Sequence, residues 1–69
     1  MNWNDYPDRE IAERVCTDKE LAVLKLKQQG YGRRLGSLHL DISDETWRTR
    51  MRNALRKIRH EKERAQEAA

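Results

Sequence analysis

The apolar positions after residue 46 repeat with the spacing of an α-helix. Four of them stand at i, i+4, i+7 and i+11, namely Trp47, Met51, Ala54 and Ile58. Because an α-helix turns once in about 3.6 residues, these side chains would share one face and contact a small core. Ser43 is a favourable N-cap, and Asp44 and Glu45 would place negative charge in the first turn. We therefore predict a helix that begins near Asp44 and continues beyond Arg59.

Two further helices are predicted in the first half of the chain. The acids that follow Pro7 favour a helix N-terminus, and we expect a short helix over residues 8–15. The run TDKE at residues 17–20 matches a capping box, in which the side chains at both ends accept backbone hydrogen bonds. The second helix should cover residues 18–29 and end at Gly30, a residue suited to the left-handed conformation. The inward apolar side chains would be Ile11, Ala12, Val15, Leu21, Val23, Leu24 and Leu26.

A third, short helix is expected over residues 33–40, bearing Leu35, Leu38 and Leu40. It is followed by a break at Asp41 and Ile42. A short helix, a break of three or four residues and a longer basic helix form a helix-turn-helix arrangement. The sequence thus predicts an all-α, small four-helix helix-turn-helix domain with a long C-terminal recognition helix. The expected divisions are an N-terminal tail at 1–7, the domain at 8–64 with its helix-turn-helix unit at about 33–59, and a frayed C-terminus at 65–69.

Composition narrows the possible functions. The chain has 69 residues, of which 36% are hydrophobic and 39% charged, so the core is thin and dimerisation or ligand binding would add stability. Cys16 alone cannot form a disulfide within the chain, and with His39 and His60 far apart it gives no zinc site. Neither a signal peptide nor an apolar run near 18 residues is present, so we expect a cytoplasmic protein that does not cross a membrane. No cofactor, metal or enzymatic motif is expected.

Charge is distributed unevenly along the chain. Residues 1–20 hold six acids against three bases, whereas residues 21–40 hold four bases and no acid. Six of the fourteen residues at 46–59 are basic and none is acidic. This polarity is typical of a nucleic-acid-binding protein, although it also fits an acidic protein partner.

The order of residues from Thr17 onward supports the same prediction. Residues 17–30, with TDKE, VLKL and a final glycine, look like a helix of the form T-x-x-E-x-x-V-L-x-L followed by Gly. Residues 40–47 look like the turn L-G-I-S-x-x-T-V, and residues 48–59 look like the helix that follows it. Together these stretches resemble region 4 of sigma-70-type transcription initiation factors and, more loosely, LuxR-type output domains. The resemblance implies a free-standing DNA-binding module.

Three positions depart from that family pattern. Gly36 stands where an apolar anchor is expected, and glycine costs a helix interior about 0.5–1 kcal/mol relative to alanine. Asp41 replaces the turn glycine, but aspartate tolerates the left-handed conformation. Trp47 replaces a smaller β-branched residue. We expect its extra bulk to fill the volume left by Gly36.

The helix-turn-helix prediction assigns a role to each polar side chain near the turn. The expected DNA base contacts are Asp44, Glu45, Arg48, Thr49 and Arg52, on the face opposite the apolar stripe. The expected phosphate contacts are Arg33, Arg34, Ser43, Arg56 and Lys57. Arginine can bind guanine O6 and N7 together, which gives about 1–3 kcal/mol of base discrimination. For the two acids, compensation of the helix dipole is an equally good interpretation.

The leading hypothesis is a sequence-specific double-stranded DNA-binding protein that acts as a small transcriptional regulator. A homodimer through the C-terminal helix, near Leu55 and Ile58, would double the DNA contacts. The alternative is a protein-interaction module that binds RNA polymerase or a host transcription factor and modulates it. The acidic N-terminal third favours that alternative, as do Trp3 and Tyr6 if they contact a partner instead of covering the edge of the core. A structural RNA binder would need stacking aromatics at regular positions, which the sequence lacks.

Overall fold

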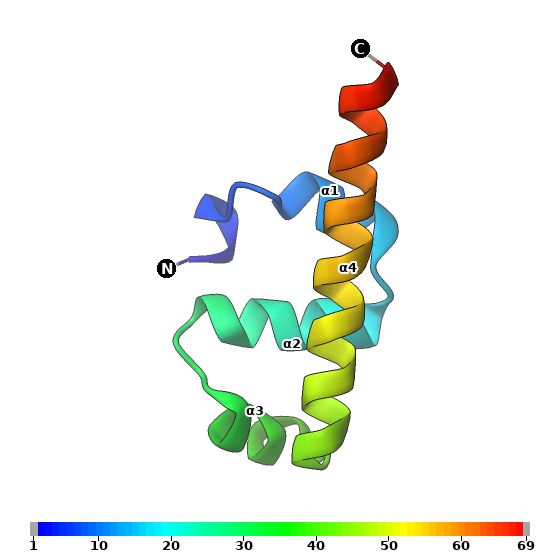
Figure 1. Ribbon diagram of the computed structural model, residues 1–69. Coiled ribbons are helices and arrows are strands. Elements are labelled where there is room, and N and C mark those ends of the chain that lie inside the picture. Colours follow the sequence, from blue (N-terminus) through cyan, green and yellow to red (C-terminus); the bar gives the residue numbers. More distant parts are fainter. Residues whose placement is uncertain (1, 69) are drawn as a thin grey trace.

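The computed structural model describes residues 2–68, and within that range every regular element is a helix. The elements are the 3-10 turn η1 (Trp3–Asp5), α1 (Arg9–Val15), α2 (Asp18–Gln28), α3 (Arg33–Leu40) and α4 (Asp44–Ala68). Figure 1 shows α4 as a long rod, with α3 near its beginning, α2 across its middle and α1 further along. Each of the three shorter helices contacts α4. The predicted all-α class with four α-helices is confirmed.

The first two helices begin and end close to the predicted residues. Asp8 is the N-cap of α1, so the helix itself begins one residue later than expected. The capping box of α2 is present, because Glu20 N–H donates to Thr17 Oγ1 at 3.2 Å and Thr17 N–H donates to Glu20 Oε1 at 2.9 Å. Helix α2 ends at Gln28, one residue early, and Gly30 adopts a positive φ of 100°. Local capping chemistry therefore fixes this helix as predicted.

Three residues connect α3 to α4. Asp41 is the C-cap of α3 and is left-handed, with φ 56° and ψ 48°, as its tolerance of that conformation allows. Ser43 caps the next helix, since the Thr46 N–H donates to Ser43 Oγ at 3.0 Å. From Asp44 the helix continues to Ala68, which includes most of the stretch expected to fray. Residue 69 lies outside the described residues.

The core forms where α1, α2 and α3 meet α4. One cluster of buried residues contains Ala12, Leu24, Ala54 and Ile58, and a second contains Val23, Leu26 and Trp47. Met51 packs against both clusters but is only half-buried, whereas we expected it to be buried with the rest of its stripe. Three of the four predicted stripe residues on α4 are thus fully in the core.

Helix α3 presents an unexpected face to the core. Leu35 and Leu38 are 63% and 71% exposed, whereas Gly36 and Ser37 are buried. A Cβ atom built on Gly36 would overlap the six-membered ring of Trp47. The prediction that Trp47 fills the space left by Gly36 is therefore confirmed.

Within the N-terminal tail that we expected at residues 1–7, the structure has the 3-10 turn η1. Trp3 packs against the first core cluster, and its ring stacks on Tyr6 with centroids 5.3 Å apart. Lys25 Nζ lies 5.7 Å from the centre of the Trp3 ring, at a cation–π distance. This placement supports the interpretation that Trp3 covers the edge of the core.

Candidate nucleic-acid interface

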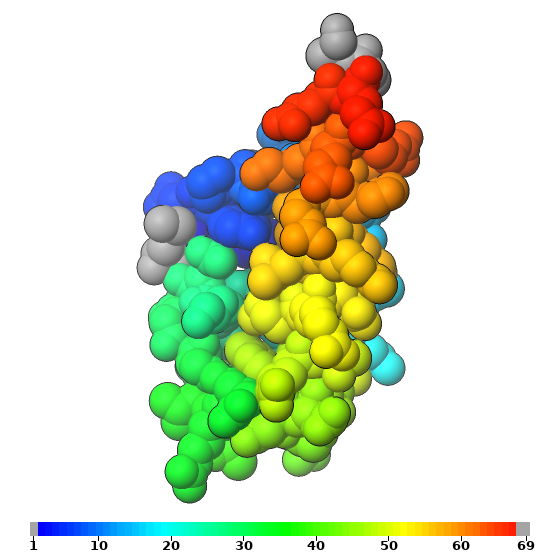
Figure 2. Space-filling view, in the orientation of Figure 1, coloured from blue at the N-terminus to red at the C-terminus, as the bar shows by residue number. Residues whose placement is uncertain are grey.

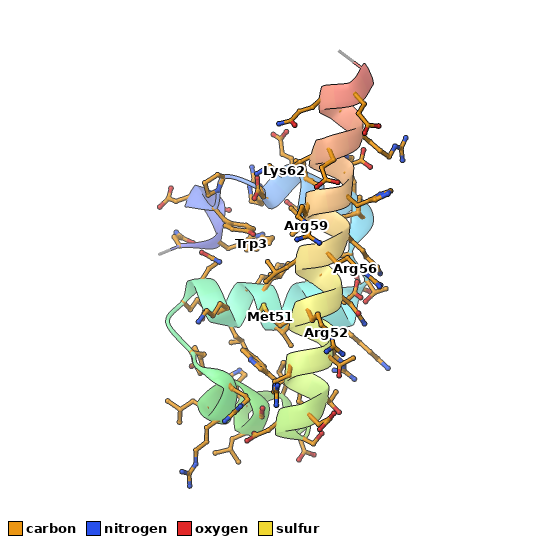
Figure 3. The ribbon with its side chains drawn as sticks, viewed as in Figure 1. Trp3, Met51, Arg52, Arg56, Arg59 and Lys62 are labelled. Carbon is orange, nitrogen blue, oxygen red and sulfur yellow. The ribbon has the colours of Figure 1, made fainter. Side chains whose placement is uncertain are left out.

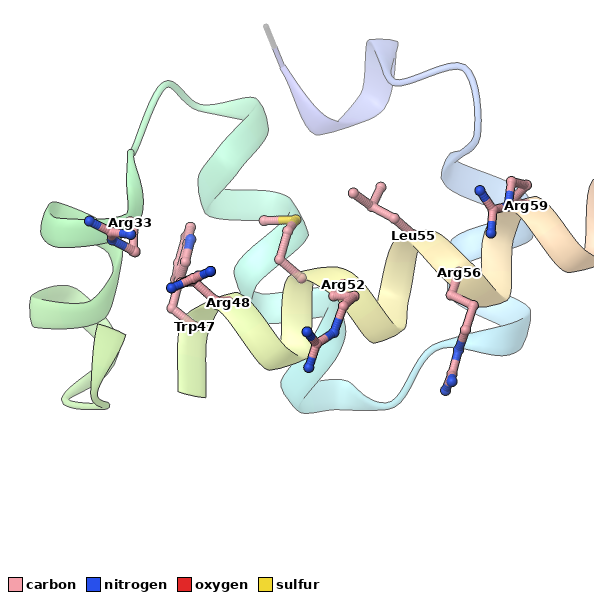
Figure 4. Close-up of a pocket in the computed structure, with 8 residues that line it drawn as sticks. Arg33, Trp47, Arg48, Arg52, Leu55, Arg56 and Arg59 are labelled. Atoms are coloured by element: carbon pink, nitrogen blue, oxygen red, sulfur yellow. The ribbon is translucent and has the colours of Figure 1, made fainter. Parts of the chain in front are cut away.

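An open groove of about 750 Å³ runs along α4, and one residue of α3 also lines it. Its lining residues are Arg33, Trp47, Arg48, Met51, Arg52, Leu55, Arg56 and Arg59. Five of these eight carry guanidinium groups and none carries a carboxylate. Figure 4 shows arginine side chains distributed along the whole length of the groove. We call this feature the arginine groove.

The periodicity of α4 explains how the arginine groove forms. Arg48, Arg52, Arg56 and Arg59 follow one another at intervals of four, four and three residues, so they share one face of the helix. All four are exposed. The side chains of Ala54 and Ile58 hold another face of α4 in the core, and the buried Trp47 also lines the groove. In the space-filling view, the side chains of α4 form one continuous edge of the molecule (Figure 2).

The predicted base-contact residues lie at and beyond the beginning of this groove. Arg48 and Arg52 line it, and Asp44 and Glu45 are exposed in the first turn of α4. Thr49 is half-buried. The Asp44 carboxylate lies 3.7 Å from Arg33 Nε, and both side chains are more than half exposed, so this ion pair is weak.

Of the five predicted phosphate-contact residues, two line the groove. Arg33 and Arg56 line the groove, whereas Arg34 is exposed at the start of α3 and is not among the lining residues. Ser43 is exposed, but its hydroxyl is occupied as the cap of α4. Lys57 lies elsewhere, because its ammonium is bound to a carboxylate of α2.

That carboxylate belongs to Glu20, which is 7% exposed. Lys57 Nζ donates to its two oxygens at 2.8 and 3.1 Å, and Thr17 N–H donates to one of them. Burial acts to raise the pKa of Glu20, but the hydrogen bonds from Lys57 and Thr17 outweigh it, so the pKa lies below its ordinary value of 4.5. The pair joins the first turn of α2 to the middle of α4. In this arrangement Lys57 serves the fold.

Three residues of this region were not identified from the sequence. Arg59 was assigned no contact, although its interval of seven residues from Arg52 places it on the same face. Leu55 was considered only as a dimer contact, and it lies in the groove with 48% exposure. Glu20 was recognised as a capping residue, but no local pattern signalled its ion pair with Lys57, 37 residues away.

The expected dimer surface needs a correction. Ile58 is 3% exposed and belongs to the core of a single chain, so it cannot contact a second chain in this structure. Leu55 alone of that expected pair is exposed. The last turns of α4 project beyond the other helices, as Figure 1 shows, with polar side chains exposed on most sides.

Other reactive side chains do not form a site in the described part of the chain. Cys16 is half-buried, and its pKa is raised by burial and by Glu20 and lowered in part by Lys57. His39 is exposed with its ring edge against Tyr31, at a centroid distance of 5.3 Å, and His60 is exposed on α4. Among residues 2–68, no three His, Cys, Asp or Glu side chains gather where they could hold a metal ion.

Comparison with known proteins found no relative of this chain. The chain matches no protein-family model, no curated protein and no solved structure. Within the described range, no helix is both long and apolar enough to cross a membrane.

Proposed function

We propose that this protein binds double-stranded DNA and regulates transcription, with α4 in the major groove. The observation that carries this proposal is the arginine groove, where five guanidinium groups line one surface without an acid among them. A cationic surface of this kind attracts the phosphate backbone and supplies most of the affinity for nucleic acid. The major groove of B-DNA, about 12 Å wide, admits an α-helix whose exposed face carries the contacting side chains.

The beginning of α4 is the part we assign to base reading. Arg48 and Arg52 are exposed one turn apart, and each guanidinium can donate two hydrogen bonds to guanine O6 and N7. Arg33, Arg56 and Arg59 flank them and are suited to phosphate. Sequence preference would therefore depend on the first two arginines, and overall affinity on all five.

The connection between α3 and α4 supports a helix-turn-helix assignment. The link has three residues, a left-handed Asp41 at its start and the capping Ser43 at its end. This combination is what the resemblance to sigma-70 region 4 implies for the turn. Under the proposal, α3 lies across the backbone and α4 enters the groove.

The test is a titration against duplex DNA. Binding to a pool of random duplexes should weaken steeply between about 50 and 200 mM salt, with log K linear in log salt. Repeated selection from the pool should then enrich a short sequence. If no duplex binding is measurable even at the lowest salt, the proposed function is wrong.

A pair of double variants separates base reading from general charge. Arg48→Ala with Arg52→Ala should remove the preference for the selected sequence, at a cost of about 1–3 kcal/mol for each lost bidentate contact. Lys19→Ala with Lys27→Ala removes the same charge from exposed positions of α2 outside the groove. This control should retain the preference. Equal effects of the two double variants would contradict the assignment of α4 as the reading element.

A further inference from the structure

The arginine groove has an apolar floor that phosphate binding does not require. Trp47, Met51 and Leu55 follow one another at intervals of four residues and all line the groove. Leu55 is 48% exposed and Met51 is half-buried, so both offer carbon and sulfur surface to a ligand. Figure 3 shows Met51 at the place where α2 crosses α4.

The length of the floor along α4 matches the length of the apolar stripe on a bound helix. The groove lining extends from Trp47, which is only 4% exposed, to Leu55, eight residues later and about 12 Å further along the axis of α4. A facing amphipathic helix presents apolar side chains at i, i+3 or i+4, and i+7 over a similar distance. The arginines that border the floor would meet the polar flanks of such a helix, and those flanks would have to be acidic.

The positive charge of the groove determines which kind of helix can bind there. A second copy of the chain placed groove to groove would bring the arginines of both copies together, and like charges oppose that contact. Carboxylates on a partner would instead bind the guanidinium groups, in bidentate fashion where the geometry allows. An acidic helix with a leucine-rich stripe satisfies both the floor and its borders.

We propose that the arginine groove binds an acidic amphipathic helix of a partner protein, with its apolar stripe on Met51 and Leu55. Such a partner occupies the same arginines as DNA and therefore excludes DNA from α4. The exclusion rests on the proposed function, whereas the binding of the acidic helix does not.

The test uses synthetic helical peptides of about 18 residues with a fluorescent label. One peptide carries leucines at i, i+3, i+4 and i+7 with glutamates on both flanks. A second has the same composition with its leucines dispersed around the helix, and a third replaces the leucines by alanine. The first peptide should bind the protein at least about tenfold more tightly than either control, because only it places apolar surface on the floor. Equal binding of all three would show a merely cationic surface and overturn the proposal, as would a lack of binding.

Variants of the floor and of the borders give separate readouts. Leu55→Lys keeps the helix but removes apolar surface from the floor, so it should weaken the leucine-striped peptide about tenfold. The added cation should instead raise the affinity for DNA. Arg56→Ala with Arg59→Ala should weaken both ligands. The far-ultraviolet circular dichroism of each variant verifies the fold. If Leu55→Lys leaves the affinity for the striped peptide unchanged, the floor does not bind it and the proposal is wrong.

Competition distinguishes this inference from the proposed function. The striped peptide should displace labelled duplex DNA from the protein, and the dispersed-leucine peptide should do so only at higher concentration. Peptide binding without any duplex binding would disprove the DNA function and leave the acidic-helix site standing. Simultaneous binding of both ligands would overturn the exclusion.

Discussion

The indole ring of Trp47 lies in the space that a side chain at Gly36 would occupy. Gly36 is in the middle of α3 and Trp47 is in the first turns of α4, so this contact determines how closely the two helices approach. The approach in turn places Arg33 beside Asp44, at 3.7 Å, and at the beginning of the arginine groove. A packing contact without polar atoms therefore positions charged residues of the candidate interface.

Gly36→Ala should destabilise the protein, although alanine is normally the better residue in a helix. The added methyl group would overlap the Trp47 ring, which is 4% exposed and has little room to move. Overpacking of this kind costs about 1–3 kcal/mol. Denaturation monitored by circular dichroism should show a loss of several degrees in Tm, since a domain of this size loses about 4–8 °C per kcal/mol.

A variant at Trp47 identifies the cause of the destabilisation. In a Trp47→Leu background the same Gly36→Ala change should be neutral or stabilising, by up to about 1 kcal/mol, because the helix propensity of alanine then acts without the overlap. An equal loss of stability in both backgrounds would mean that the Trp47 ring is not the obstacle.

The sequence predicted the helices well because their ends are determined locally. Thr17 and Ser43 cap the helices that follow them, and these side chains act within three residues of their own position. The core face of α4 also followed from its periodicity. The face of α3 did not follow from its pattern, because Gly36 and Ser37 are small residues without an apolar side chain, and yet both are buried. At Gly36 the space is filled by the ring of Trp47.

The candidate site was predicted only in part, because helix periodicity shows which residues share a face but not what packs against that face. Arg48, Arg52 and Arg56 were recognisable from their spacing on one helix, and Arg59 could have been added by the same rule. The role of Lys57 could not be predicted from spacing, because its partner Glu20 lies on another helix. Periodicity places a cation on a face of its own helix, but the element that packs against that face decides whether the cation is available to a ligand.

The Glu20–Lys57 pair should make the protein sensitive to acid. Because the pKa of Glu20 is lower in the folded chain than its ordinary value, the unfolded chain binds this proton first as pH falls. The contribution of Glu20 is therefore fully present above about pH 4.5 and is lost as pH falls through the folded pKa. Urea denaturation at pH 7 and at several values below pH 4.5 measures the loss.

Glu20→Gln should remove much of this pH dependence and lower the free energy of unfolding at pH 7 by about 1–3 kcal/mol. Glu13→Gln is the matched control, since Glu13 forms only an exposed ion pair with Arg9 at 3.5 Å. Its effect should stay below about 0.5 kcal/mol. If the acid response of Glu20→Gln equals that of the unmodified protein, another carboxylate is responsible.

Leu35 and Leu38 should tolerate polar replacement. Both lie on the exposed side of α3, at 63% and 71% exposure, so a lysine or glutamine there leaves no cavity. Leu38→Gln should change the free energy of unfolding by no more than about 0.5 kcal/mol. Leu24→Ala, at a leucine that is 1% exposed, should cost about 2–5 kcal/mol. A large loss in Leu38→Gln would show that α3 packs by its leucines in solution.

Asp44→Asn tests whether the acid at the start of α4 opposes or assists DNA binding. The change removes a negative charge from the exposed first turn and releases Arg33 from its ion pair. If Asp44 only compensates the helix dipole, DNA affinity should rise by up to about fivefold, and stability should fall by about 0.3–1 kcal/mol. Asp18→Asn makes the equivalent change in the first turn of α2, outside the groove, and should lower stability alone. Filter binding with the selected duplex decides between the two roles. A fall in affinity for Asp44→Asn, confined to one base position of the selected sequence, would instead identify Asp44 as a base contact.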